Sequence, residues 1–493
     1  MKNTKYLLLL TCLLSACGKG FLDISPEQFQ KEGNYFKNAD QFNQAMNGAY
    51  APLQGLYTGS HWVMTEMRSD NTSYQKNTSD ASGFSREELD EFREQDDNSY
   101  VYSFFNYSYN GISRCNTVLD HLSGASIDET VKAQITGQAS FLRALYYFNL
   151  VRLYGDIPLT VHEVTSTNGA FSIADRKPAA DVYTQIIADA QAAIDNLPDA
   201  WTNAKDKGRA VKASAQTLLA EVYLTQKQYD KAIPLLRAVM QSPNGYTLLP
   251  DYASLYTLAN ENSAESIFEV QYMEGSSNEY SDFMYQFAPY NAGSGITGFG
   301  LYTGSGSGWN IPTQNMLDAY EAGDKRKDAS ISLSFTDPNT NKVVPYVIKY
   351  KTPHAIRYQT GSNFPVYRFA DVLLMLAECL NETAFAANGE AYTLLNQVRA
   401  RAGLAPKTAG NANPALNVSS QEAFRQAVWQ ERRVELAFED HRWFDLLRTG
   451  QATAVMQAHA VEEKSLKSYL VPAAYTNIRP QYQYPRREVQ LMQ

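Results

Sequence analysis

Three carboxylates recur at a spacing of four residues near the end of the sequence: Glu431, Glu435 and Glu439. On a helix this spacing places them on one face, and a facing pair of carboxyl groups is what glycoside hydrolases use as general acid and base. Basic residues are interleaved with these three, at Arg432, Arg433, Arg442 and Arg448. We therefore expect internal salt bridges that lock the last helices, and not a catalytic pair. The sequence also lacks the nucleophile elbow of serine hydrolases.

The histidines and cysteines do not have the spacing of metal ligands. None of the six histidines lies within three to five residues of another, and no Cys-x-x-Cys motif occurs. We expect no zinc or haem site and no other cofactor. Loop carboxylates leave a structural calcium as an open alternative, although their spacing is not that of an EF-hand: Asp80, Asp90, Asp96 and Asp97.

Residues 293–298 (GSGITG) match the glycine fingerprint of dinucleotide-binding folds by their letters. In such folds a strand leads directly into the glycines and a helix opens behind them. Neither is predicted here, and further glycines follow as far as Gly308. We therefore expect a loop and no nucleotide site.

Aromatic residues give the stronger indication of function. The chain has 33 Tyr, 22 Phe and 5 Trp, and several rings stand in Gly- or Ser-bearing contexts typical of loops: Trp62, Tyr74, Tyr290, Phe299, Tyr302 and Trp309. A flat ring is an apolar platform on which a pyranose can stack, while nearby polar side chains bond its hydroxyls. The ligand-binding residues that we predict come from two segments: Trp62, Arg68, Asp70, Asn71 and Tyr74 from the first, and Tyr302 and Trp309 from the second.

The N-terminus has the layout of a bacterial lipoprotein export signal. Lys2 and Lys5 precede an apolar stretch that ends in Leu-Ser-Ala-Cys17. About nine apolar residues cannot span a bilayer, which needs roughly 20. We predict a signal peptide at residues 1–16 and a lipid anchor of acyl chains such as palmitate on Cys17, which holds the mature chain at a membrane. The alternative is an ordinary secreted protein whose signal happens to end in cysteine.

The net charge excludes some classes of ligand, and the cysteines bear on possible disulfides. The formal net charge of −9 argues against nucleic acid and against an anionic substrate held by a basic field. Cys115 and Cys379 lie in segments with apolar helix faces. We expect two buried free thiols, with a disulfide between them as the alternative.

Apolar residues recur with a helical period through most of the chain. The helices that we predict cover residues 38–55, 104–122, 130–153, 179–197, 211–225, 229–240, 370–387 and 391–402, and a further helical pair lies within residues 421–447. Residues 219–232 resemble the tetratricopeptide pattern, in which small alanines let paired helices approach closely. The predicted fold is mostly α, with about four tetratricopeptide-like helical pairs.

A large loop-rich insert with minor β structure separates the helical sets. We predict strands within residues 265–272 and 342–350, and a Gly-, Ser- and Tyr-rich loop at 275–308. Residues 72–98 are polar and are predicted to form a long exposed loop with at most a short helix near 86–93. After a tether at residues 17–36, residues 37–493 are predicted to form a single domain, with an N-terminal part to about 260 and a C-terminal part from about 261.

Several blocks, in order along the mature chain, resemble the SusD/RagB family of outer-membrane nutrient-binding lipoproteins of Bacteroidetes. They are residues 21–26 (FLDISP), 66–70 (EMRSD), 110–116 (NGISRCN), 137–159 (GQASFLRALYYFNLVRLYGDIPL), 208–213 (GRAVKA), 365–378 (PVYRFADVLLMLAE), 396–403 (NQVRARAG) and 431–448 (ERRVELAFEDHRWFDLLR). The sequence departs from the family pattern at Gln138 and Asp440, where the family often has Glu and Gly.

The resemblance implies a mostly helical SusD-like fold and a non-catalytic function. A protein of this family captures an oligosaccharide at the outer membrane, facing the cell exterior, and presents it to a SusC-like TonB-dependent barrel. A peptide-binding member of the same family and a surface polysaccharide-degrading enzyme are the alternatives. With a stacked ring at Trp309, Trp309→Ala is expected to weaken glycan binding by about 1 to 3 kcal/mol.

Overall fold

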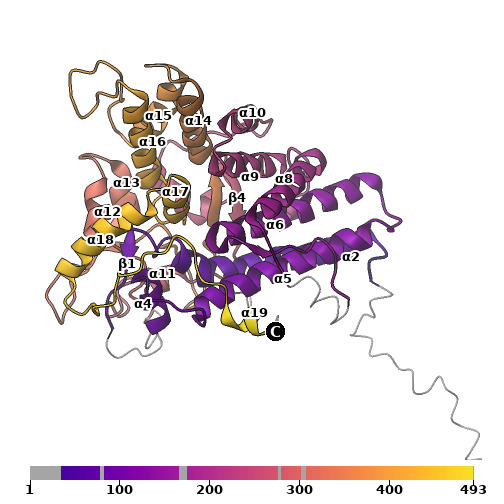
Figure 1. Cartoon of the computed structure of the whole chain (residues 1–493), viewed down its shortest axis with the longest axis horizontal. Coiled ribbons are helices and arrows are strands. Elements are labelled where there is room, and N and C mark those ends of the chain that lie inside the picture. Colours follow the sequence, from indigo (N-terminus) through magenta and orange to yellow (C-terminus); the bar gives the residue numbers. More distant parts are fainter. Residues whose placement is uncertain (1–34, 78–82, 166–174, 276–278, 301–306, 492–493) are drawn as a thin grey trace, which may run out of the picture.

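A computed structural model describes residues 35–77, 83–165, 175–275, 279–300 and 307–491 (Figure 1). The described chain is mostly helical with a few short strands, so the predicted fold class is confirmed. The predictions for the signal peptide, for the lipid anchor at Cys17 and for Tyr302 fall outside the described residues. The predicted domain boundaries stay a prediction.

The N-terminal half is a row of helices that lie side by side (Figure 1). The bounds are α2 Ala39–Gly55, α5 Ser99–Leu122, α6 Glu129–Tyr154, α8 Ala179–Asn196, α9 Lys212–Thr225 and α10 Tyr229–Met240. Side chains of Asn38, Asn98 and Asp128 accept hydrogen bonds from the first turns of α2, α5 and α6, so these helices begin at capping residues. Gly111 lets α5 approach α6, because a Cβ there would lie 2.2 Å from the ring of Tyr146.

The row continues with helices from the far end of the sequence. These are α14 Phe369–Ala384, α15 Glu390–Arg401 and α16 Gln421–Glu435. Helix α10 packs on α14, and α14 packs on both α15 and α16, so the insert between residues 241 and 368 does not interrupt the row. The predicted helices of both halves therefore exist and pack as neighbours, in the order that paired helical repeats require.

The predicted helical pair within residues 421–447 is present, but Glu439 does not share a helix with Glu431 and Glu435. Helix α16 ends at Glu435, and α17 (Arg442–Arg448) begins after a tight break. Phe438 and Asp440 in the break both have a φ of 66°, a left-handed conformation that an α-helix cannot contain. The glycine often found in the family at the position of Asp440 suits this φ. A further helix that the periodicity did not predict, α18 (Ala452–Leu466), follows.

Four antiparallel pairs of short strands connect distant segments. They are β1 (Thr72–Ser73) with β5 (Ile311–Pro312), β2 (Ile157–Pro158) with β3 (Arg176–Lys177), β4 (Ser266–Val270) with β8 (Phe364–Arg368), and β6 (Ile331–Ser332) with β7 (Tyr346–Val347). The predicted strands at 265–272 and 342–350 contain β4 and β7.

Short helical turns fill the remaining connections. Their bounds are η3 Leu56–His61, α3 Trp62–Met64, α4 Phe84–Asp90, η4 Ala204–Asp206, η5 Tyr252–Tyr256, η6 Leu258–Asn260, α11 Phe283–Phe287, α12 Gln314–Ala319, α13 Lys325–Ser330 and α19 Arg486–Leu491. Helix α4 lies in the stretch where a short helix was predicted. The described residues of the stretch, 72–77 and 83–98, do not form an exposed loop, however, because many of their side chains are buried, among them Tyr74, Asp90 and Glu94.

One cluster of buried apolar side chains extends from Phe42 to Tyr482 and joins both halves of the row. A smaller cluster, around Met284 and Tyr285, supports the insert. Cys115 and Cys379 are buried and free, as predicted. Within the described ranges, none of the helices combines the length and the apolar character that crossing a bilayer requires.

Candidate functional site

The structure brings the two predicted binding segments together. Strand β1 pairs with β5 in the register Thr72 to Pro312, which places Tyr74 and Trp309 with ring centres 6.0 Å apart. The Arg86 guanidinium lies 5.0 Å from the ring centre of Trp309 and 5.6 Å from that of Trp62. These four side chains therefore form one local cluster, although they are far apart in sequence. No sequence pattern predicted the β1–β5 pairing.

The three rings of this cluster are buried, which does not suit the stacking role predicted for them. Trp62 is 0 % exposed, and Tyr74 and Trp309 are each 2 % exposed. The indole N–H of Trp62 donates to the Thr58 carbonyl at 3.0 Å, and its ring meets Phe287 edge-on. These rings are part of the buried core beside the β1–β5 strand pair.

The predicted polar residues are buried as well, and each has a structural partner. Arg68 pairs with Glu94 at 2.6 Å and stacks 3.7 Å over the ring of Phe92. The Asn71 side-chain amide donates to Glu66 at 2.9 Å. Side chains with such buried, satisfied contacts are not available to a ligand at the surface.

Asp70 is held by two arginines from the C-terminal helices. Its carboxylate lies 2.7 Å from Arg442 and 2.9 Å from Arg433. Burial opposes its ionisation, but these guanidiniums outweigh burial and hold the pKa of Asp70 well below its usual range. Asp70 therefore ties the first predicted segment to the helices α16 and α17.

Other rings of the same region do reach the surface. Phe84 at the start of α4 is 52 % exposed, Tyr469 beyond α18 is 38 % exposed, and Tyr290 and Phe299 are half-buried. Tyr290 and Phe299 are among the rings that the sequence suggested, whereas Phe84 and Tyr469 were missed. Nothing in its local sequence distinguishes Tyr469, which meets Tyr74 from a position almost 400 residues further along the chain.

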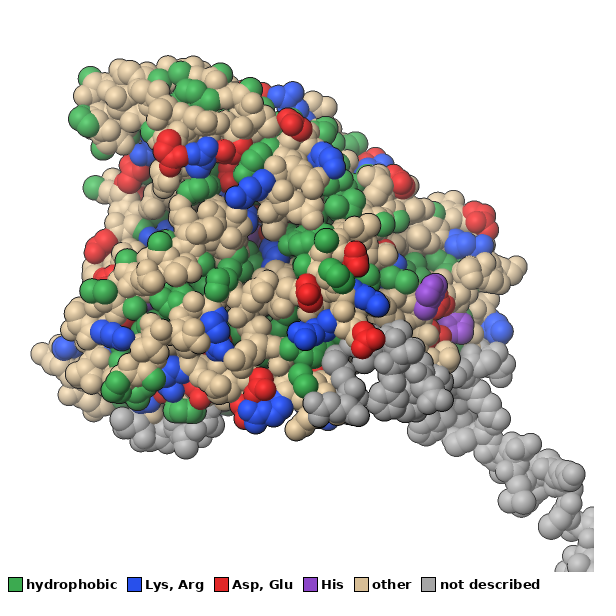
Figure 2. Space-filling view, viewed as in Figure 1, with side chains coloured by type: hydrophobic (Ala, Val, Ile, Leu, Met, Phe, Trp, Pro, Cys, Tyr) green, Lys and Arg blue, Asp and Glu red, His purple; other side chains and the backbone are tan. Residues whose placement is uncertain are grey.

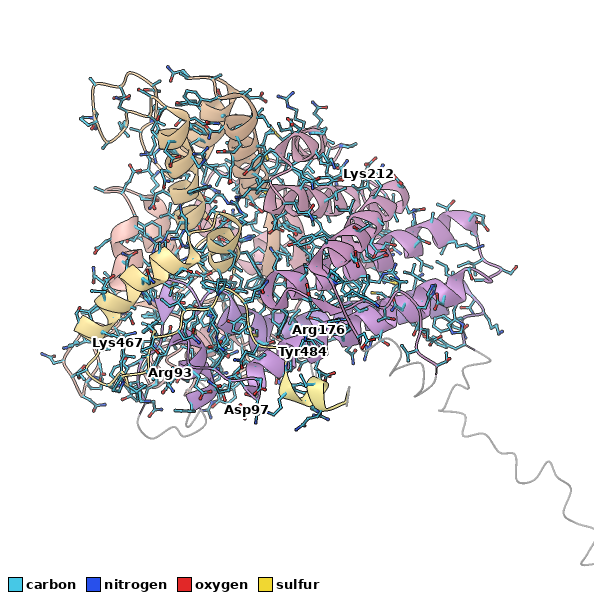
Figure 3. The ribbon with its side chains drawn as sticks, viewed as in Figure 1. Arg93, Asp97, Arg176, Lys212, Lys467 and Tyr484 are labelled. Atoms are coloured by element: carbon cyan, nitrogen blue, oxygen red, sulfur yellow. The ribbon has the colours of Figure 1, made fainter. Side chains whose placement is uncertain are left out.

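Tyr469 and Tyr290 both contact the short segment formed by Tyr74 and Gln75. The Tyr469 hydroxyl donates to the carbonyl of Tyr74 at 3.3 Å, and the backbone N–H of Tyr290 donates to the side-chain oxygen of Gln75 at 3.0 Å. Lys467 and Arg93, labelled in Figure 3, border this region: their charged groups lie 5.4 Å from the ring of Tyr74 and 5.2 Å from that of Phe84.

Fixed amides accompany these rings. The Asn291 side-chain amide donates to Asp337 at 2.6 Å, and that of Gln75 lies 3.4 Å from both Asn291 and Asp337. We call Phe84, Tyr290 and Tyr469, together with Gln75 and Asn291, the ring surface. It combines apolar faces with oriented donors and acceptors, which is the chemistry that a sugar requires.

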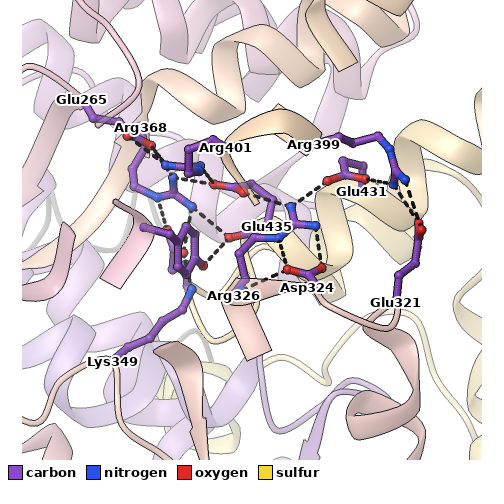
Figure 4. Close-up of polar contacts among 12 residues, drawn as sticks. Glu265, Glu321, Asp324, Arg326, Lys349, Arg368, Arg399, Arg401, Glu431 and Glu435 are labelled. Atoms are coloured by element: carbon purple, nitrogen blue, oxygen red, sulfur yellow. Dashed lines mark hydrogen bonds and ion pairs between the residues drawn. The ribbon is translucent and has the colours of Figure 1, made fainter. Parts of the chain in front are cut away.

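The predicted salt bridges of Glu431, Glu435 and Glu439 are present (Figure 4). Their partners are not the neighbouring arginines of the same helices. Arg326 pairs with Glu431 at 2.6 Å, and Arg368 pairs with Glu439 at 2.6 Å. The arginines of α16 and α17 pair instead with other carboxylates, as in Arg432 with Asp371, Arg442 with Asp70 and Arg448 with Glu378.

This network does not provide an acid and a base. Burial opposes the ionisation of Glu435 and Glu439, but the surrounding cations outweigh it and lower the pKa of each to about 2. A general acid needs a pKa near the working pH, so neither carboxyl can supply a proton. The network locks the insert, α15 and α16 together.

The part of the chain that the structure describes contains neither a candidate metal site nor the strand and helix that a nucleotide-binding glycine motif requires. No group of three or more His, Cys, Asp or Glu side chains there is arranged to hold a metal ion. Asp96 and Asp97 pair with Arg486, and Asp80 falls outside the described residues. Residues 293–298 form turns with neither a strand before them nor a helix behind them. The face drawn in Figure 2 carries acidic and basic side chains interspersed.

Two family models match the chain. The one described as the SusD family matches residues 334–492, and the one described as starch-binding associating with outer membrane matches residues 20–224. Each covers one of the two halves of the helical row. The chain belongs to the SusD/RagB family. The description of the second model associates its members with the outer membrane.

Relatives cover nearly the whole chain. A SusD-like protein, P2 of Formosa agariphila, is 29% identical over 93% of this chain and 94% of its own length. Among solved structures, a laminarin binding SusD-like protein has a TM-score of 0.76 and 26% identity over 93% of this chain and 98% of that chain. Surface glycan-binding protein A from Bacteroides thetaiotaomicron, solved with laminarihexaose, has a TM-score of 0.72 at 20% identity, over 92% and 98% of the two chains, which is a likeness of fold.

Proposed function

We propose that this SusD/RagB protein binds an oligosaccharide nutrient at the cell surface without cleaving it. The observation that carries the proposal is its likeness, along 93% of the chain, to a laminarin binding SusD-like protein. The surroundings of the carboxylates agree with a non-catalytic role, since Glu431, Glu435 and Glu439 are engaged in buried ion pairs.

The ring surface replaces the buried rings as the proposed site. Tyr290 and Tyr469 are both accessible, and the backbone contacts around Tyr74 and Gln75 hold them in place. A pyranose face that stacks on these rings brings its hydroxyls within reach of Gln75 and Asn291. Because the amides are already fixed by hydrogen bonds, binding orders few side chains.

Isothermal titration with hexasaccharides of different linkage tests this proposal: laminarihexaose, maltohexaose, cellohexaose and xylohexaose, with oligopeptides alongside. We expect one sugar to bind and to be recovered uncleaved. Tyr290→Ala and Tyr469→Ala should each weaken binding, whereas Tyr107→Ala should not, since Tyr107 is an exposed ring on α5 outside the ring surface. Binding of peptides alone would overturn the proposal in favour of a peptide carrier, and cleavage of the sugar would establish an enzyme.

We further propose that acyl chains on Cys17 anchor the protein in the outer membrane, with the ring surface toward the cell exterior. The export signal and Cys17 support this assignment, as does the family's association with the outer membrane. Cys17→Ser should remove incorporation of labelled palmitate and shift the protein to the soluble fraction. Labelled, membrane-bound Cys17→Ser protein would contradict the anchor.

Delivery to a SusC-like TonB-dependent barrel is the last part of the proposal. Family membership supports it, because capture at the surface is useful to the cell only when a transporter takes up the sugar. Gentle detergent extraction and affinity purification of the intact lipoprotein should recover a barrel protein in near-equal amount. Recovery of the lipoprotein alone, from cells that express the barrel, would contradict the partnership.

A further inference from the structure

A hollow that contains no residue of the ring surface lies beside strand β4. Its volume is about 540 Å³, and it is lined by residues 200–211 on one side and by residues 262–269 on the other. Trp201 and Tyr246 contribute aromatic rings to its wall. A volume of this size is in the range of small-molecule sites. Lys212, labelled in Figure 3, marks the start of α9 directly after the 200–211 segment.

Hydrogen bonds within the protein fix the positions of the Trp201 and Tyr246 rings without a ligand. The indole N–H of Trp201 donates to the Ala210 carbonyl at 3.0 Å. The Asn244 side-chain amide donates to the Tyr246 hydroxyl at 3.1 Å and to the Asp199 carbonyl at 2.6 Å. Both rings are half-buried, so they combine a fixed position with an accessible face. Such pre-ordered rings lower the entropic cost of stacking a ligand.

The floor of the hollow is polar and equally fixed. The Glu269 carboxylate accepts hydrogen bonds from the backbone N–H of Asn262 at 3.0 Å and from the Asn363 side chain at 3.0 Å. Asn262 and Gln271 exchange a pair of amide hydrogen bonds at 2.8 and 3.0 Å. Donors and acceptors are thus both present beside the rings, which matches the hydroxyl groups of a sugar.

The hollow extends past the 200–211 segment. A second hollow of about 230 Å³ shares Lys207, Gly208, Arg209, Phe268 and Glu269 with the first, and continues to Tyr50 and Gln271. Gly208 has a φ of 91°, and a Cβ there would lie 2.5 Å from the Gln271 side chain. Glycine therefore lets the segment lie close to the end of β4, and we call the two neighbouring hollows, with their five shared lining residues, the trough.

The charges in the trough favour an uncharged ligand. Lys207 is exposed. The lining also contains Lys205 and Arg209 together with Glu269 and Glu279, so both signs of charge are present. An anionic sugar gains little in such a mixed field.

We propose that this trough, defined by Trp201, Lys207, Tyr246, Glu269 and Gln271, is a second saccharide-binding site that takes a neutral oligosaccharide of several pyranose units. The ligand class rests on the proposed function, but the location does not, because the two sites share no residue. Two separate sites on one chain would let the protein hold a long glycan at two points, which raises the effective affinity.

Titration with the same four hexasaccharides, in a series of variants, separates the two sites. The wild-type protein should bind two hexasaccharides per chain, and the Tyr290→Ala/Tyr469→Ala variant should retain one of them. Adding Trp201→Ala to that variant should weaken the remaining binding at least tenfold, while Trp201→Phe, which keeps a ring, should weaken it less. Lys207→Ala alters only an exposed side chain and should also weaken it without lowering the melting temperature.

Each failure has a distinct signature. If the wild-type protein binds sugar but the Tyr290→Ala/Tyr469→Ala variant binds none, the trough is not a saccharide site and the proposed function stands. If the wild-type protein binds no sugar, the proposed function fails, and the trough inference with it. If the trough variants keep all sugar binding and lose only the co-purifying barrel, the trough is a protein interface and the inference is overturned.

Discussion

The Glu66 carboxylate accepts a hydrogen bond from the backbone N–H of Asp440, at 3.2 Å. It accepts another from the backbone N–H of Phe438, at 3.0 Å. Both donors belong to the left-handed break between α16 and α17, so a side chain from the N-terminal half holds the backbone that ends the long C-terminal helix. Successive N–H groups in such a conformation form a small anion-binding nest.

Replacing Glu66 should therefore destabilise the whole fold. Glu66→Ala leaves the N–H groups of Phe438 and Asp440 and the side-chain amide of Asn71 buried without acceptors. Unpaired buried donors cost about 1 to 3 kcal/mol each, so we expect a loss of at least about 2 kcal/mol in the free energy of unfolding. Urea unfolding followed by circular dichroism measures it.

Glu66→Gln is the matched control for this prediction. The amide keeps the size of the side chain and one acceptor oxygen, so it should cost less than alanine. Equal stability of Glu66→Ala and the wild-type protein would mean that water replaces the carboxylate, and would contradict the role given to the nest.

The buried charge network makes a second prediction. Arg326 is fully buried and pairs with Asp324, Glu431 and Glu435. Arg326→Met should cost about 3 to 5 kcal/mol of unfolding free energy, because it leaves the buried Asp324 without its cation and removes one of the cations around Glu431 and Glu435. Differential scanning calorimetry should show a lower melting temperature.

Arg237 provides a surface pair for comparison. It meets Glu390 at 2.7 Å, but both side chains are about half exposed. Arg237→Ala should change the free energy of unfolding by less than about 1 kcal/mol, since water screens exposed pairs. Similar losses for Arg326→Met and Arg237→Ala would argue that the network does not hold the insert in place.

The same network predicts a loss of stability in acid. Burial opposes the ionisation of Glu439, but Arg368 and Lys349 outweigh it and lower its pKa to about 2, against 4.5 for an ordinary Glu. Its contribution is therefore complete above pH 4.5 and is lost as the pH falls from 4.5 through 2, by up to about 1.4 kcal/mol per pH unit. Urea unfolding between pH 6 and pH 2 should follow this course, and Glu439→Gln should flatten it.

The pKa of Asp90 is shifted in the opposite direction to that of Glu439, so its effect on stability has the opposite dependence on pH. Burial raises its pKa to about 8, against an ordinary value of 3.8. The folded state then holds a proton that the unfolded chain has released, so the contribution of Asp90 falls as the pH rises from about 4 through 8. The stability of Asp90→Asn relative to wild type should rise over that window, and a constant difference would contradict the raised pKa.

Local patterns predicted the helices well because the causes of a helix are local. The apolar period and the capping residues Asn38, Asn98 and Asp128 lie within or beside the segments that they organise. The position of the break after Glu435 was not predicted, since Glu66, which binds its backbone N–H groups, lies more than 360 residues away in sequence. The partners of Glu431 and Glu439 were missed for the same reason, since Arg326 and Arg368 come from the insert.

The sequence did not indicate which rings of the predicted segments are exposed. Gly- and Ser-rich surroundings indicate a loop, but they do not indicate whether another segment of the protein buries an aromatic ring in that loop. Trp309 is buried because its segment pairs with β1, and Tyr469 is accessible because α18 ends beside Tyr74. Exposure therefore depends on contacts between distant segments, which composition does not encode.

The burial of Trp309 changes what its substitution should do. Trp309→Ala removes a ring that packs against Tyr74 and Arg86, so we expect a loss of about 3 to 5 kcal/mol in the free energy of unfolding. Any effect on glycan binding would then follow from the loss of folded protein. Thermal unfolding without sugar measures this loss directly.

Tyr290→Ala should have the opposite profile. Tyr290 is half-buried and can lose its ring without opening the core, so the melting temperature should stay close to that of the wild-type protein. Loss of one stacked ring should weaken glycan binding by about 0.5 to 1.5 kcal/mol, which is roughly two- to tenfold in the dissociation constant. If Trp309→Ala instead left stability intact and abolished binding while Tyr290→Ala changed neither, the sugar would bind at the buried cluster, which would have to open to admit it.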